Sequence, residues 1–139
     1  MKKVKLLFVV LFLSTIALTS CGKYDEGPSI SLRSKTARIT GEWKLVKQEY
    51  NGVDVALDAD DKSMVMNIQK DGVYVLTSSY GSFTGTWEFS SDKTKFITNF
   101  VILGQTTTSE ETILRLTNKE LILESIEDGD KSRIELEKE

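Results

Sequence analysis

Beyond its first third, the chain alternates apolar and polar residues with a period of two, and turn-forming residues interrupt this pattern at regular intervals. A period of two is typical of β-strands that bury one face, and frequent turn signals indicate strands joined as hairpins. In the segment 82–89, for example, Phe83, Trp87 and Phe89 share one face while polar residues fill the other. The chain is therefore expected to fold as an all-β protein.

The alternation predicts eight strands, with one face of each toward a core. Two tight turns, Asp71-Gly72 and Asp128-Gly129, join strands at positions where both residues tolerate positive φ. In the sixth strand we expect Thr112, Leu114 and Leu116 to share a face. The expected strands are residues 41–50, 62–69, 73–79, 82–89, 95–103, 107–116 and 121–127, and a last strand after Gly129.

No amphipathic helical stretch of useful length separates these strands, so parallel crossover units are not expected. Consecutive antiparallel strands leave two open edges in a flat sheet, and closure into a barrel removes both. We therefore predict a small antiparallel up-and-down β-barrel. A two-sheet sandwich is the alternative, but the hairpin-length links leave no long crossover for a Greek key.

The N-terminus has the features of an export signal. Lys2, Lys3 and Lys5 precede an apolar run over residues 6–18, and Cys21, the only cysteine, follows. This order is typical of a signal peptide that is removed by cleavage. The run is too short to cross a bilayer, which takes about 20 residues.

The stretch Leu18-Thr19-Ser20-Cys21 resembles the lipobox of bacterial lipoproteins. The resemblance implies that residues 1–20 are removed and that Cys21 carries diacylglycerol, which anchors the chain in the outer membrane. The alternative is an ordinary signal peptide that happens to contain a cysteine. Residues 21–40 contain the only proline and little periodicity, so we expect a flexible tether of up to roughly 60 Å before a domain over residues 41–139.

The acidic pair Asp25 and Glu26 after Lys23 resembles the signals that export Bacteroidetes lipoproteins to the cell surface. A solvated linker is the alternative interpretation.

Composition excludes several functions. Without residues 1–20 the chain keeps 15 basic and 21 acidic residues, a net charge of −6, and it has no basic stretch for nucleic acid. The sequence contains no histidine, which removes the usual general base and the commonest metal ligand. We expect a non-catalytic protein without a cofactor or a bound metal.

Four motifs in order resemble the short lipocalin-like domains of Bacteroidetes lipoproteins. They are Gly41-Glu42-Trp43-Lys44-Leu45, Asp71-Gly72, Gly85-Thr86-Trp87, and the Leu-Thr-x-x-x-Leu-x-Leu pattern of 116–123. The resemblance implies a lipocalin-like barrel that can hold one small ligand or be filled by its own side chains. Unlike longer lipocalins, this chain has one cysteine and little sequence after the last strand.

An interior row of large side chains is the candidate site for a small hydrophobic or amphipathic ligand. Its members are Tyr74, Phe83, Trp87 and Phe89, with Met64 and Met66. The alternative is that these residues fill the barrel, which would then act as a cell-surface interaction or structural module. Trp43 is expected to plug the closed end.

The longest link, residues 51–61, is expected to lie as a lid across the open mouth. Its four aspartates suggest calcium, but their spacing does not match an EF-hand loop, and a solvated acidic loop is the preferred interpretation. Glu110 and Glu111 are expected to be surface charges.

Overall fold

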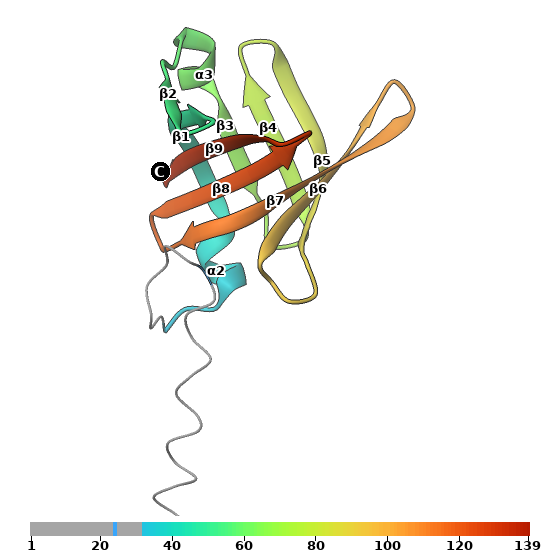
Figure 1. The fold of residues 1–139 in the computed structure, drawn as a ribbon. Coiled ribbons are helices and arrows are strands. Elements are labelled where there is room, and N and C mark those ends of the chain that lie inside the picture. The colour runs from blue at the N-terminus through green and yellow to red at the C-terminus, as the bar shows by residue number, and fades with distance from the viewer. Residues whose placement is uncertain (1–23, 25–31) are drawn as a thin grey trace, which may run out of the picture.

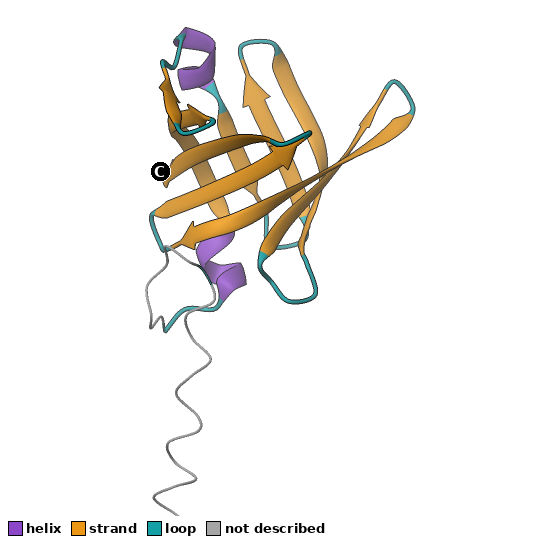
Figure 2. Cartoon of the chain, viewed as in Figure 1, coloured by secondary structure: helices purple, strands orange, loops and turns teal. Residues whose placement is uncertain are grey.

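The computed structural model describes Tyr24 and residues 32–139. Cys21, the lipobox and most of the predicted tether lie outside this described part of the chain. The described part holds two short helices and nine strands, coloured by type in Figure 2. They are α2 (Lys35–Ile39), β1 (Gly41–Tyr50), β2 (Val53–Val55), α3 (Ala59–Ser63), β3 (Val65–Ile68), β4 (Val73–Ser78), β5 (Gly81–Phe89), β6 (Lys95–Ile102), β7 (Gln105–Leu116), β8 (Glu120–Glu127) and β9 (Asp130–Lys138).

The strands close into an antiparallel barrel. β1 and β3 to β9 pair in chain order, and β1 also pairs with β9 from Trp43–Lys138 to Tyr50–Ser132 (Figure 1). β2 adds a short hairpin to the end of β1 only. The predicted eight-stranded up-and-down barrel is confirmed, because the first and last strands of a sandwich would not join in this way.

The link after β1 is more ordered than a loop, and it shortens the next strand. The Asp58 carboxylate accepts from the Asp61 backbone N–H, and the Asp61 carboxylate accepts from that of Asp58. This reciprocal capping box starts α3. The strand predicted from residue 62 therefore begins at Val65, and Met64 caps the helix.

The inward face of β7 differs from the predicted one. The pairing of β7 with β8 shifts between Ile113 and Arg115, which is the signature of a β-bulge. Ile113 and Leu116 are both buried, whereas Thr112 is exposed. A one-residue shift moves side chains to the opposite face of the strand. The alternation counted back from Leu114 and Leu116 therefore gives the wrong inward face for the residues before the bulge, such as Thr112.

One end of the barrel is plugged by α2 and by Trp43. Ile39 and Trp43 are fully buried, and the Trp43 indole Nε1 donates to the Ile39 carbonyl oxygen at 2.7 Å. The Arg38 Nη1 donates across to the Leu116 carbonyl at 2.7 Å. The expected position of Trp43 at the closed end is confirmed.

The C-terminal end of β9 holds this plug in place. The Lys138 ammonium donates to the carbonyl oxygens of Arg38 and Thr40 at 2.6 and 2.7 Å. It also lies 4.7 Å from the centre of the Trp43 ring, a cation–π distance. The end of the chain therefore caps the carbonyls at the end of α2.

The described part of the segment assigned to the tether is folded against the barrel. α2 belongs to it, and the buried Tyr24 joins the core and donates its hydroxyl to the Lys93 carbonyl at 3.0 Å. The Lys35 ammonium lies over the Tyr24 ring at 4.2 Å. The folded domain therefore begins before Gly41.

Removing the Trp43 plug should destabilise the barrel in two measurable steps. Trp43→Phe keeps most of the apolar contact but leaves the buried Ile39 carbonyl without its donor, a loss of about 1–3 kcal/mol. Trp43→Ala should cost about 3–5 kcal/mol because it also leaves a cavity. Urea unfolding followed by circular dichroism measures both values. Equal stability of Trp43→Phe and the parent chain would contradict the proposed role of this hydrogen bond.

Candidate functional site

Aromatic side chains fill the middle of the barrel. The Tyr74 ring packs edge-on against Phe96 and Phe100, with ring centres 6.0 and 5.2 Å apart. Trp87 contacts Phe89 and Phe96 at 5.4 and 5.9 Å. This network spans β4, β5 and β6 and packs the centre of the barrel with rings in contact.

The network depends on a close approach of β5 to β6 at Gly85. Gly85 lies opposite Tyr74 on β4 and opposite Phe100 on β6. A Cβ atom at Gly85 would lie 2.2 Å from the Asn99 carbonyl oxygen and 2.9 Å from the Phe100 ring. Only glycine fits here, because the Asn99 backbone and the Phe100 ring occupy the space that a side chain would take.

Above this network, at the end of the barrel away from α2, the interior stays open and apolar. A hollow of about 240 Å³ is lined by Leu76, Phe83, Phe100 and Ile102. Leu76 and Phe83 face each other across β4 and β5, while Phe100 and Ile102 belong to β6. Phe83 is 45% and Ile102 48% exposed, which is unusual for side chains on the inward face of a barrel. These four residues define the apolar hollow.

The link between β1 and β3 covers part of the rim beside this hollow. Leu57 packs against the core, and the Tyr80 hydroxyl of the β4–β5 turn donates to an Asp60 carboxylate oxygen at 2.9 Å. The predicted lid thus spans the rim from β1 to the β4–β5 turn.

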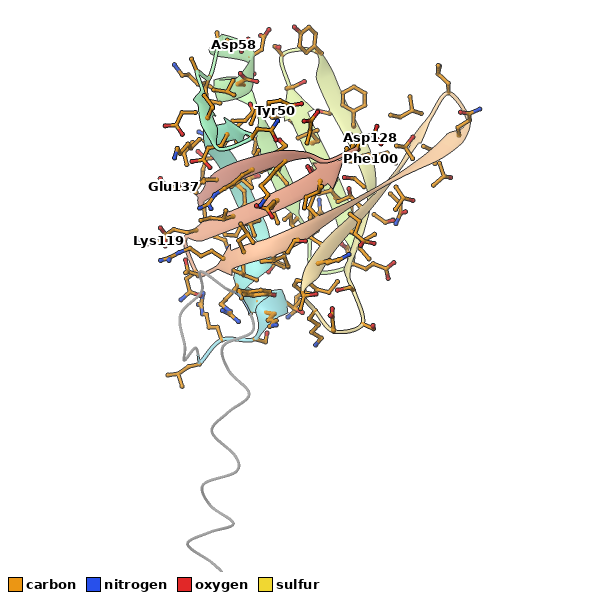
Figure 3. The ribbon with its side chains drawn as sticks, in the orientation of Figure 1. Tyr50, Asp58, Phe100, Lys119, Asp128 and Glu137 are labelled. Carbon is orange, nitrogen blue, oxygen red and sulfur yellow. The ribbon has the colours of Figure 1, made fainter. Side chains whose placement is uncertain are left out.

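The opposite side of the open end is acidic. A second hollow of about 210 Å³ is lined by Tyr50, Ser125, Glu127, Asp128, Asp130 and Ser132. Figure 3 labels Tyr50 and Asp128 from this side and Phe100 from the apolar side, with Lys119 and Glu137 at the far end of β8 and β9. A hydrogen bond from the Tyr50 hydroxyl lowers the pKa of Asp130, which favours its charged form.

Glu111 is the inward-facing acid nearest the middle of the barrel. It pairs with Phe96, which is 1% exposed, and it lies two residues before Ile113, which is 2% exposed. Side chains two residues apart on a strand share a face, so Glu111 points inward. Its neighbour Glu110 faces outward and forms an ion pair with Lys95. The prediction that both glutamates are surface charges is therefore wrong for Glu111, because the β7 bulge hid the true phase of the strand.

Burial raises the pKa of the Glu111 carboxyl from its ordinary value of 4.5 to about 6. Burial, and then the Glu111 charge, also raise the pKa of the Tyr74 phenol. The two groups therefore interact within one poorly hydrated interior. Among the hydrogen bonds and ion pairs of the described residues, none uses the Glu111 carboxylate.

The structure distributes the predicted ligand-lining residues over two levels. Tyr74, Trp87 and Met66 are buried in the filled middle, and Phe89 and Met64 pack against that core. Only Phe83 of the predicted set reaches the apolar hollow. The candidate site is therefore nearer the rim than predicted.

Sequence reasoning missed Leu76, Phe100, Ile102 and Glu111 as site residues. Alternation alone places Leu76 on the face of Tyr74, and counting back from Ile113 places Glu111 inward. The side of β6 that faces the interior could not be chosen, because that strand is apolar on both faces.

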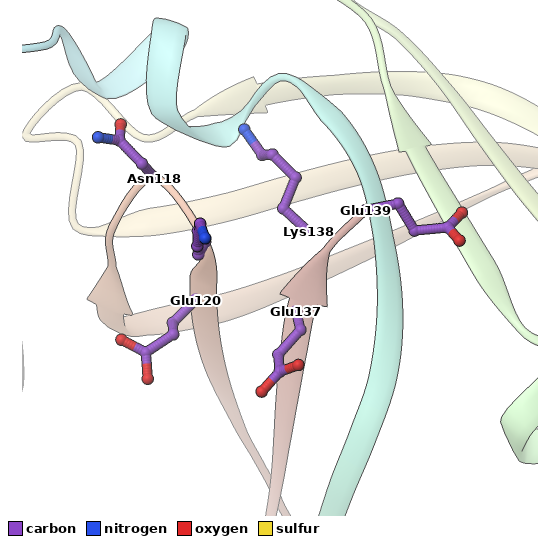
Figure 4. Close-up of a pocket in the computed structure, with 6 residues that line it drawn as sticks. Asn118, Glu120, Glu137, Lys138 and Glu139 are labelled. Carbon is purple, nitrogen blue, oxygen red and sulfur yellow. The ribbon is translucent and has the colours of Figure 1, made fainter.

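A larger hollow of about 590 Å³ lies at the opposite end, between the β7–β8 turn and the end of β9. Figure 4 shows its lining by Asn118, Lys119, Glu120, Glu137, Lys138 and Glu139, with the Lys138 ammonium turned toward the α2 segment. All six side chains are polar, and Lys138 already serves the carbonyls of Arg38 and Thr40. This hollow lacks the apolar walls typical of small-molecule sites.

The acids of the first link have structural roles. Asp58 and Asp61 cap α3, and Asp60 accepts from Tyr80. Within the described residues, no group of three or more metal-ligating side chains is placed to hold an ion. In the same part of the chain, no helix is long and apolar enough to cross a membrane.

The raised pKa of Glu111 predicts a pH-dependent stability. The folded state holds this proton more tightly than the unfolded state, so the free energy of unfolding falls as pH rises from about 4.5 to about 6 and is level above that range. The free energy of unfolding should fall by about 2 kcal/mol over this range, since each pKa unit corresponds to about 1.4 kcal/mol. Glu111→Gln should abolish this step and should be more stable than the parent at pH 7.

Urea unfolding at several pH values measures the difference between the two proteins. Glu110→Gln is the matched control, since Glu110 lies on the outer face beside Lys95, and it should keep the parent's step. Parallel stability curves for Glu111→Gln and the parent would contradict the burial of Glu111.

Comparison with known proteins supports the same fold. A family model described as a lipocalin-like domain matches residues 39–123, more than half of the chain. The match begins at the buried Ile39 of α2 and ends at the buried Leu123 of β8. No curated protein matches the chain. The closed eight-stranded barrel and the matched segment together show that this chain belongs to the lipocalin-like domain family.

Proposed function

We propose that this domain binds a small hydrophobic or amphipathic molecule at its open end, without covalent chemistry. The observation that carries the proposal is the apolar hollow, whose four lining residues are all hydrophobic and which stays open although the middle of the barrel is filled. Burial of a ligand's apolar surface there would supply the binding energy, at about 25 cal/mol per Å².

The size of the hollow limits the ligand. Its volume of about 240 Å³ is below the roughly 300–1,000 Å³ of sites for drug-sized molecules. The aromatic network below, including Tyr74 and Phe100, blocks deeper entry. A ligand of this site is therefore a short chain or a small ring system.

We further propose that the protein is a lipoprotein of the outer membrane, anchored through acyl chains on Cys21. The support is the order of Lys2, Lys3 and Lys5, an apolar run and the lipobox-like Leu18-Thr19-Ser20-Cys21. Two or three acyl chains make attachment stable. The acidic pair Asp25 and Glu26 resembles a signal for export to the cell surface. If the domain is exposed on the surface, protease added to intact cells should digest it.

The binding proposal predicts that N-phenyl-1-naphthylamine, a neutral apolar fluorescent probe, brightens on the protein and is displaced by 1-octanol. Phe83→Ser removes one aromatic side chain from the wall of the apolar hollow and should weaken probe binding about tenfold. Fluorescence titration measures the change. If the probe does not brighten, or if 1-octanol does not displace it, the proposal is contradicted.

Val101→Ser is the matched control for this experiment. Val101 is 70% exposed and neighbours Ile102 on the same strand, but it points to the opposite face. Its replacement removes a similar apolar surface from the hairpin and should leave probe binding unchanged. An equal loss in both variants would locate the probe outside the apolar hollow.

The anchor is tested by metabolic labelling with a tagged fatty acid. The parent protein should take up label and Cys21→Ala should not, while both are detected by immunoblot. Equal labelling of the two proteins would contradict lipid attachment at Cys21.

A second candidate function is a cell-surface interaction module without a ligand. The observation that favours it is the tip of the β6–β7 hairpin, where Val101 is 70%, Ile102 48% and Leu103 100% exposed. Contiguous exposed apolar side chains mark interaction sites more often than isolated ones. Failure of the probe experiment would favour this function over ligand binding.

A further inference from the structure

We propose that the ligand of the open end carries a protonated amine on its apolar body, and that the inward-facing Glu111 carboxylate binds this amine. The inference rests on the proposed ligand-binding function and names the chemical class of the ligand. It is carried by the placement of charges on the inner face of the barrel.

Charges on the inner face have one sign at the open end. Glu127 and Asp130 pair with each other on β8 and β9, on the face shared by Ser125 and Ser132. With Glu111 they give three acids at inward positions. Among the described strands, Lys138 is the only basic residue at an inward position, and it lies at the closed end with its ammonium held by carbonyls. The open end therefore presents a negative potential to an entering ligand.

Among the residues that the structure describes, none forms an ion pair with Glu111 that would balance its charge. The nearest charges in register, Lys95, Glu110 and Glu124, lie on the outer face, where Lys95 pairs with Glu110 and Glu124 with Lys131. On the inner face the Glu111 charge acts on the Tyr74 phenol, whose pKa it helps to raise, while the pKa of Glu111 itself is raised by burial. A half-buried carboxylate whose charge is not balanced is costly, so a cation from outside would find an unused acceptor.

The strand pairing leaves an approach to Glu111. β7 pairs with β8 only over residues 112–116, while residues 105–112 pair with β6. Glu111 lies where the β6–β7 hairpin leaves the barrel wall, beyond the last β7–β8 pair, Thr112–Glu124. Figure 1 shows this hairpin projecting away from β8 and β9. A polar group can therefore reach Glu111 without crossing the aromatic network.

The walls around this position suit an amine on an apolar chain. Tyr74 and Phe100 contact each other edge-on at 5.2 Å, and Phe100 also lines the apolar hollow. Aromatic faces attract ammonium groups. An apolar body in the hollow and an ammonium near Glu111 would use both features at once, whereas a fatty acid carboxylate would be repelled.

The test compares octylamine with 1-octanol, which have the same chain length, by isothermal titration calorimetry. Octylamine should bind at least about tenfold more tightly than 1-octanol at pH 7.5. Because octylamine stays protonated well above neutral pH, its affinity should rise as Glu111 ionises around pH 6, while 1-octanol should show no such rise. Glu111→Gln should lose the octylamine advantage and keep 1-octanol binding.

Glu110→Gln is the matched control and should bind both probes as the parent does, since Glu110 lies on the outer face. If 1-octanol binds but octylamine binds no more tightly, or if Glu111→Gln keeps the advantage, the amine inference is overturned and the ligand-binding function stands. If neither probe binds, both are overturned.

Discussion

The fold depends on the closure of β1 against β9, because that pairing turns a meander with two exposed edges into a barrel. The same two strands build the closed end. β1 supplies Trp43, and β9 supplies Lys138, whose ammonium holds the carbonyls of Arg38 and Thr40. α2 is therefore part of the barrel's end, fixed by hydrogen bonds to residues about a hundred positions away in the chain.

With one end plugged and aromatic rings packed in the middle, the apolar hollow at the open end is the proposed place for a ligand. Trp87, Phe96 and Tyr74 take up the central volume, and Gly85 lets β6 approach closely enough for their rings to touch. At the open end lie two separate hollows, an apolar one on β4 to β6 and an acidic one on the ends of β1, β8 and β9. An amphipathic ligand matches such a divided surface better than a purely apolar one.

The eight barrel strands, their order and most of their boundaries were predictable, since alternation and the Asp-Gly turns are local signals that the barrel does not override. The short strand β2, the helix α2 and two further features were not. The Asp58–Asp61 capping box starts a helix too short to show a helical period. The bulge between Ile113 and Arg115 reverses the phase of β7, which concealed Glu111. The position of the candidate site near the rim depends on these features and on the packing of rings from different strands. The pattern of a single strand does not encode that packing.

The docking of Tyr24 changes the geometry of attachment to a membrane. Its hydroxyl is held by the Lys93 carbonyl in the β5–β6 turn, at the end of the barrel that α2 plugs (Figure 1). Only Gly22 and Lys23 separate Cys21 from Tyr24, and the three residue-to-residue steps span at most about 11 Å. The proposed lipid on Cys21 would therefore keep the docking point of Tyr24, at the plugged end, close to the bilayer surface. The apolar hollow, at the other end of the barrel, would then lie at the end farther from that attachment point.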